Sequence, residues 1–192
     1  MKTVKMQRDD ADTYSSLHDD MSSIEMNRSV MKRELMTQLF ENALKDMYWE
    51  EKALIRIMPM MIKHASSRAL VNALESHLTE THEQVVRLEV VFSIIGKKPS
   101  AKRCEAMEGL IKEGEEIIKE TVEGPQRDAG LIAAVRKVEH YEIASYSMLC
   151  FYAKTLNLDS AVVILQELLQ QEKAADANLE ELAIININVS QV

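Results

Sequence analysis

Apolar residues recur at helical spacing along most of the chain, and this pattern constrains the fold most strongly. Residues 29–64 contain no glycine, and one helical face collects apolar side chains. These are Met36, Phe40, Met47, Leu54, Met58 and Met61. With five glycines and three prolines in 192 residues, long helices meet few breaks. The sequence therefore predicts an all-α protein, and its length fits one domain.

Five helices follow from this spacing and its interruptions. We predict them at residues 29–64, 67–95, 102–120, 128–156 and 159–183. Two long helical hairpins, joined by a crossover that carries a short extra helix, make a ferritin-like four-helix bundle. We expect the bundle to span 29–185, with a disordered or loosely docked N-terminal tail at 1–28 and a C-terminal tail at 186–192.

Charge and hydropathy argue against two classes of partner. The net charge is −8 without a dense lysine and arginine cluster, so binding to nucleic acid is not expected. No segment approaches the roughly 18 apolar residues of a membrane helix, and the first residues lack a signal-peptide core. Cys104 and Cys150 are expected to be buried, reduced thiols. We therefore expect a cytoplasmic protein with no membrane partner.

Glutamates on apolar helical faces are the strongest functional signal. Because successive helical residues are about 100° apart, Glu139 and Glu142 fall within about 40° of the centre of the apolar face of 128–156. Glu51 and Glu172 lie within the stripes of their helices, and Glu80 flanks the stripe of 67–95. An unpaired buried carboxylate costs several kcal/mol. These acids therefore require protons, cations or a metal ion to compensate them.

Position along the bundle brings the acids together. Two residues of an antiparallel hairpin stand side by side when the midpoint between them falls at the turn. The midpoint of Glu51 and Glu80 falls between residues 65 and 66, and that of Glu142 and Glu172 falls at Asn157, both at predicted turns. Each acid then lies about 14 residues, or roughly 20 Å, from its hairpin end. Both hairpins thus bring acids to the middle of the bundle.

Buried salt bridges are the alternative to a metal site. The nearest cations are predicted to point outward, which favours a metal; they are Lys52, Arg56, Arg136 and Lys137. An oxygen-rich site suits iron or manganese, and bridging carboxylates hold two such ions in helical bundles. We predict two metal ions per chain, with iron first and manganese as the alternative. Additional ligands, or groups that hydrogen-bond the ligands, would be His77, Gln84, Asp176 and Tyr146. For His77, an ordinary place in the core also remains open.

Five segments of the chain carry a family resemblance. They are DMYWEEKAL, ESHLTETHEQVVRLEVVF, IGKKPSAKRCEAMEGLI, RDAGLIAAVRKVEHYEIASY and LLQQEKAADANLEELA. Over about residues 35–183 the chain resembles the YciE/YciF-type ferritin-like stress proteins. The resemblance implies a bundle that forms homodimers, a dinuclear metal centre and induction under stress. By position it implies the ligands that helical geometry also selects, which are Glu51, Glu80, Glu139, Glu142 and Glu172.

One departure from the wider di-iron pattern concerns histidine. Neither Glu80 nor Glu172 is followed three residues later by histidine, since Glu83 and Ala175 stand there. The pair Glu139-x-x-Glu142 does resemble the third-helix pair of rubrerythrin-like proteins.

The function predicted first is that of a di-iron stress-response protein that oxidises Fe(II) with O2 or peroxide. Glu80 and Glu172 would bridge the ions, and the other three glutamates would bind at the ends. Nothing in the sequence shows turnover, so no catalytic residue is assigned. One alternative is a non-catalytic binding or assembly protein with a structural metal site. The other is a manganese catalase-like enzyme that disproportionates peroxide. A storage cage is not expected, because nothing indicates a closed shell.

Overall fold

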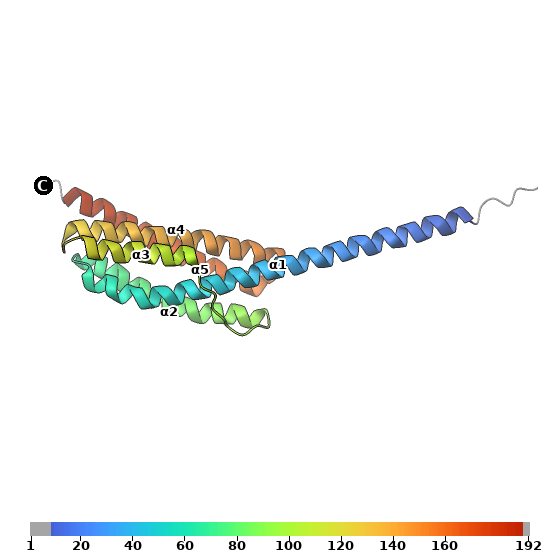
Figure 1. Ribbon diagram of the computed structural model, residues 1–192, viewed down its shortest axis with the longest axis horizontal. Helices are drawn as coiled ribbons and strands as arrows, with labels where there is room; N and C mark the ends of the chain where they lie inside the picture. The colour runs from blue at the N-terminus through green and yellow to red at the C-terminus, as the bar shows by residue number, and fades with distance from the viewer. Residues whose placement is uncertain (1–8, 190–192) are drawn as a thin grey trace, which may run out of the picture.

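Five helices make up the part of the chain that the computed structural model describes, which is residues 9–189 for the backbone and 26–185 for side-chain burial. They are α1 (Asp9–His64), α2 (Arg68–Ile94), α3 (Glu105–Glu120), α4 (Pro125–Thr155) and α5 (Asp159–Val189) (Figure 1). No strand occurs in this range, so the all-α prediction is confirmed. None of the described helices has the length and hydropathy of a membrane span.

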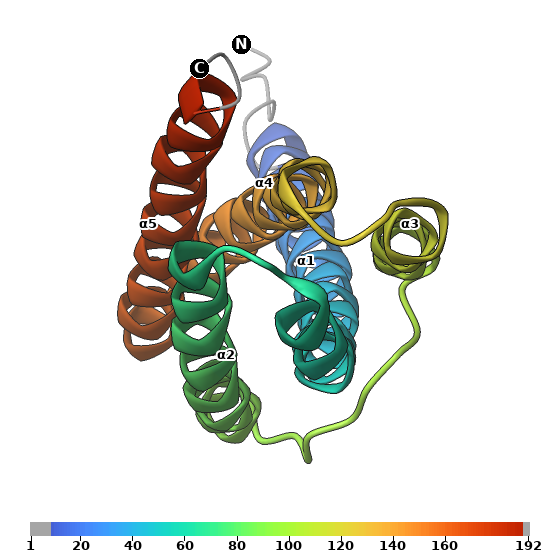
Figure 2. The same cartoon turned by 90° about the vertical axis from the view of Figure 1, so that its left-hand side faces the viewer.

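The four long helices form the bundle, and α3 lies outside it. Helix α1 packs on α2 and α4 packs on α5, while contacts of α1 with α4 and of α2 with α5 close the bundle. Figure 2 shows α3 beside α1 and α4, apart from the other helices. The predicted ferritin-like bundle with a short helix in its crossover is therefore confirmed.

Asp128 fixes the direction of α4 within the bundle. Its carboxylate is buried and accepts hydrogen bonds from the backbone N–H groups of Ser66 and Ser67, at 2.8 and 2.7 Å. This contact places the start of α4 at the turn where α1 ends, so α4 runs antiparallel to α1. At the other end, Asn157 has a φ of 59° in the short turn between α4 and α5, where asparagine is one of the few tolerated side chains.

Helix α1 begins earlier than the sequence analysis predicted, at Asp9 rather than Ser29, and extends well beyond the bundle (Figure 1). Residues 9–28 contain no glycine or proline that would stop a helix. Their lack of an apolar stripe predicts a tail, but a helix that leaves the bundle needs no such stripe. Helix α5 likewise continues to Val189. The division into a bundle and two tails stays a prediction.

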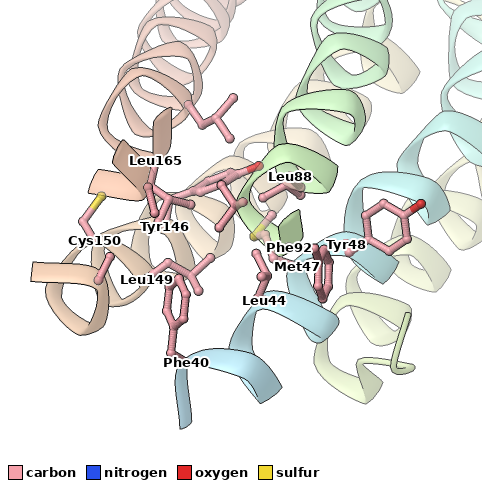
Figure 3. Close-up of a cluster of buried hydrophobic side chains, with 14 of the residues drawn as sticks. Phe40, Leu44, Met47, Tyr48, Leu88, Phe92, Tyr146, Leu149, Cys150 and Leu165 are labelled. Atoms are coloured by element: carbon pink, nitrogen blue, oxygen red, sulfur yellow. The ribbon is translucent and has the colours of Figure 1, made fainter. Parts of the chain in front are cut away.

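The core consists of two apolar clusters at different heights. The first, shown in Figure 3, gathers around Phe40, Phe92 and Leu149. The second gathers around Met58 and Leu131. On each long helix the two clusters leave a gap, and buried polar residues fill it: Glu51 on α1, His77, Thr81 and Gln84 on α2, Glu139 and Glu142 on α4, and Glu172 on α5. A polar layer therefore lies between two apolar ones.

Candidate metal centre

Four side chains from three helices converge in the polar layer. They are His77 from α2, Glu139 and Glu142 from α4, and Glu172 from α5. Each offers one ligand atom, and these atoms lie within 4.8 Å of one another. All four side chains are buried. The four-residue group, as we call this set, could hold a metal ion.

His77 and Glu139 are arranged like two ligands of one ion. Nε2 of His77 lies 3.1 Å from Oε1 of Glu139, yet neither atom has a hydrogen-bond partner. Two ligands that each lie about 2.1 Å from an ion at a right angle are about 3.0 Å apart. This geometry places His77 in the group that could hold a metal ion, whereas its role as a ligand stays a prediction.

Two further predicted residues hold carboxylates of the layer in place. The hydroxyl of Tyr146 donates a hydrogen bond to Oε1 of Glu51, and Nε2 of Gln84 donates one to Oε1 of Glu172. Glu51 is fully buried but lies outside the four-residue group. Hydrogen bonds of this kind fix the orientation of ligands in metal sites.

Burial changes the ionisation of the whole layer. It is the main cause that raises the pKa of Glu51, Glu139 and Glu142 well above the usual range, and neighbouring carboxylates add to the rise. Burial also raises the pKa of Glu172 to about 7, against the hydrogen bond from Gln84. It lowers the pKa of His77 to about 4, so this imidazole is neutral at pH 7. A neutral imidazole can ligate a metal, and a metal ion can replace the protons on the carboxyls.

The unpaired oxygens of the layer fit a metal site and not a set of buried salt bridges. Both oxygens of Glu139 and Glu142, and one each of Glu51 and Glu172, are buried without a hydrogen-bond partner. Among the side chains whose burial is described, no lysine or arginine is buried. Buried polar groups nearly always have partners, so these oxygens are the expected places for cations.

The structure leaves two of the predicted residues outside the group. Glu80 is half-buried at its rim, where Oε1 accepts a hydrogen bond of 3.4 Å from the hydroxyl of Ser76. Asp176 pairs instead with Nε of Arg136 at 2.8 Å and with Nε2 of His140 at 3.1 Å. The side chains of Arg136 and His140 are not buried, so Asp176 is held on the outer side of the bundle rather than in the group.

Sequence reasoning left the role of His77 open and did not predict the burial of Glu50. No histidine stands three residues after Glu80, whereas His77 stands three residues before it and offers its imidazole from the same helical face. Glu50 is 1% exposed, although a rotation of 100° per residue puts it at the edge of the apolar face of α1 and not at its centre. Helix α3 packs on α1, and Cys104, the residue that caps the start of α3, lies within hydrogen-bond distance of Glu50, which accounts for this burial.

Two openings flank the polar layer on opposite sides of the bundle. One, between α2 and α5, is a cavity of about 200 Å³ lined by His77, Glu80 and Asn178, among others. The other, between α1 and α4, is a groove of about 280 Å³ lined by Asp46, Glu50 and other residues. The first opening borders the layer at His77, and the second borders Glu50, the residue before Glu51.

Comparison with known proteins shows close relatives. Protein YciF from Escherichia coli (strain K12) is 43% identical over 159 residues, which cover 82% of this chain and 96% of YciF. The crystal structure of the E. coli stress protein YciF matches with a TM-score of 0.77 and 42% identity, over 80% of this chain and 97% of that one. YcfI from Rhodopseudomonas palustris matches with a TM-score of 0.74 and 41% identity, over 76% and 92% of the two chains.

A family model described as a domain of unknown function, DUF892, matches residues 36–191. This range includes every residue of the polar layer and begins after the part of α1 that leaves the bundle. The chain therefore belongs to the DUF892 family, as a YciF-like protein.

Proposed function

We propose that this chain is a stress-response protein with a dinuclear iron site that oxidises Fe(II), with dioxygen or peroxide as the oxidant. The observation that carries the proposal is the convergence of His77, Glu139, Glu142 and Glu172 in a buried layer with unpaired oxygens. Similarity to the E. coli stress protein YciF supports the stress context.

The four-residue group would hold the first ion. Glu51 would hold the second together with oxygens shared from the group, and Glu80 could reach it from the rim. Five carboxylates with one imidazole form an oxygen-rich set that favours iron or manganese over metals that prefer thiolate. When bound, iron in this site would supply the electrons that reduce dioxygen or peroxide.

The chain's own residues prepare the site for this chemistry. Tyr146 and Gln84 hold Glu51 and Glu172, so part of the carboxylate geometry exists before any ion binds. The two apolar clusters keep bulk water from the layer above and below. The cavity beside His77 and Glu80, at about 200 Å³, is larger than the roughly 10–15 Å³ that one water molecule needs, so it has room for dioxygen or peroxide.

The test measures metal content and turnover in the same preparation. Full-length protein is stripped of metal, titrated with Fe(II) without oxygen, and analysed for bound iron. Oxygen or peroxide is then added, and its consumption is followed with Fe(II) in excess. We expect about two iron ions per chain and consumption of oxidant in proportion to the Fe(II) supplied. Glu142→Gln should lose bound iron, whereas Glu83→Gln, an exposed position on α2, should not.

Each other outcome has a clear meaning. Iron that binds without any consumption of oxidant would contradict the oxidase proposal and favour a structural metal site. Oxygen release from peroxide by manganese-loaded protein alone would favour a catalase-like enzyme. Equal iron content in Glu142→Gln and wild-type protein would show that the site lies elsewhere.

A further inference from the structure

A groove between α1 and α4 leads from the surface towards the polar layer. It is lined by Ala43, Asp46 and Glu50 from α1 and by Tyr141, Ala144, Ser145, Met148 and Tyr152 from α4. Asp46 stands at its outer part with a side chain that is 32% exposed. Glu50 lies one helical turn further along α1 and is 1% exposed. Two carboxylates of decreasing exposure thus follow each other into the molecule.

Glu50 is a buried acid without a complete set of partners. Its Oε2 atom has no hydrogen-bond partner among the described residues. The site proposed above does not use Glu50, and a buried unpaired carboxylate costs too much to be retained for packing alone.

The groove and the metal centre share a wall, which is formed by neighbouring residues of the same two helices. Glu50 precedes Glu51 on α1, and Tyr141 precedes Glu142 on α4. Since neighbouring helical residues point about 100° apart, one of each pair faces the groove and the other faces the bundle.

We infer that this groove is the entry route for divalent metal ions to the buried centre, with Asp46 as the first carboxylate that an ion meets and Glu50 as the second. The inference rests on the proposed metal site and adds how that site is filled. An ion that leaves water at Asp46 would meet Glu50 before it reaches Glu51 and Glu142, so its charge remains balanced by carboxylates along the way.

The opposite opening is less suited to a cation. Its lining includes one carboxylate, Glu80, and is otherwise formed mainly by small or apolar side chains together with His77 and Asn178. It offers no acid outside Glu80 that could collect an ion from solvent. We assign this side to the neutral oxidant and the α1/α4 groove to the cation.

Lys102 competes with the incoming ion at the mouth of the groove. Its Nζ lies 3.2 Å from Oδ1 of Asp46, and its side chain is 59% exposed. An exposed ion pair of this kind is weak and opens easily. Removal of Lys102 should therefore speed the entry of metal, whereas removal of the charge of Asp46 should slow it.

The chain carries a natural reporter for the test. Trp49, its single tryptophan, precedes Glu50, so bound Co(II) should quench its fluorescence. Metal-free full-length protein is mixed with Co(II) in a stopped-flow instrument, and bound metal is measured after equilibration. We expect Asp46→Asn and Glu50→Gln to load roughly three- to tenfold more slowly with unchanged final metal content. Lys102→Gln should load faster than wild-type protein.

A pair of steric variants provides the matched control. Ala144→Phe narrows the α1/α4 groove and Asn178→Phe narrows the opposite opening, both at exposed positions. Slow loading should follow from Ala144→Phe alone. Wild-type rates in both Asp46→Asn and Ala144→Phe, or slow loading only in Asn178→Phe, would overturn the entry route while the metal site stands. Failure of wild-type protein to bind any metal would overturn both proposals.

Discussion

The apolar cluster around Phe40 and Phe92 and the polar layer beside it lie about one helical turn apart on the same four helices. The cluster stabilises the fold, because its side chains leave water and pack against one another. The layer destabilises the metal-free fold, because Glu51, Glu139, Glu142 and Glu172 are buried with unpaired oxygens. The apolar cluster thus supplies stability and the polar layer supplies ligands, at different heights of one bundle. Removal of an apolar side chain from the cluster should lower stability and keep the metal, whereas removal of a carboxylate charge from the layer should raise the stability of the metal-free protein and lose the metal.

The largest effect is expected from a cavity in the apolar cluster. Phe92 is fully buried, and Phe92→Ala should lower the free energy of unfolding by about 3–5 kcal/mol. The folded variant should keep its full metal content, because the cluster supplies no ligand. Urea unfolding and elemental analysis measure both quantities. Phe151→Ala removes the same ring from a 55% exposed position and should cost less than about 0.5 kcal/mol. Selective loss of metal in Phe92→Ala would contradict the separation of the two heights.

The next effect is an unusual pH dependence of the metal-free protein. Carboxyls whose pKa is raised by folding keep protons that the unfolded chain has released, so the native state binds more protons and stability falls as pH rises. Each such proton contributes a fall of about 1.4 kcal/mol per pH unit. The fall should run from the ordinary glutamate value of 4.5 to about 7 for Glu172 and further for the other acids of the layer. Urea unfolding at pH 5 to 8 tests this, and a stability that rises across this range would refute it.

A smaller gain should follow from the loss of one charge. At pH 8, Glu142→Gln removes the need to keep a buried carboxyl protonated, so the metal-free variant should be about 1–2 kcal/mol more stable than wild-type protein. Because the same variant should lose metal, wild-type protein should be the more stable of the two once Fe(II) is added. Thermal unfolding of both proteins with and without Fe(II) shows whether the order of their stabilities reverses. Parallel shifts would mean that Glu142 contributes only packing.

The smallest effect concerns the hydrogen bond that holds Glu51. Tyr146→Phe removes the donor and leaves the ring in place, at a cost of about 1 kcal/mol in the metal-free protein. Because Glu51 would be free to turn, metal affinity should fall while the final metal content is kept at saturation. Tyr152→Phe, on the same helix at the surface groove, is the matched control and should change neither quantity.

Helical geometry was enough to predict the central residues of the layer. Glu51, Glu139, Glu142 and Glu172 lie near the centre of an apolar face, where an angle of 100° per residue leaves no doubt about the side on which a residue falls. All four are buried. Their common height followed from the positions of the turns, which the sequence marks with serine and asparagine.

Residues at the edge of a face could not be placed in the same way. Glu80 and Glu50 both border an apolar stripe, yet Glu80 is half-buried at the rim and Glu50 is 1% exposed. The difference depends on what packs over each edge: Glu50 lies on the side that α3 covers, and Glu80 lines the opening between α2 and α5. This is information about tertiary packing, which the periodicity of a single helix does not contain.

The extension of α1 beyond the bundle has a consequence for how the protein moves through solution. At about 1.5 Å per residue, the 56 residues of α1 span about 84 Å, whereas the 31 residues of α4 span about 46 Å. A rod attached to a compact body increases translational friction, so the Stokes radius will exceed that of a globular protein of 21.8 kDa. A single chain could elute from a sizing column at the apparent mass of a pair. The predicted homodimer should therefore be tested by light scattering or sedimentation equilibrium, which report mass independently of shape.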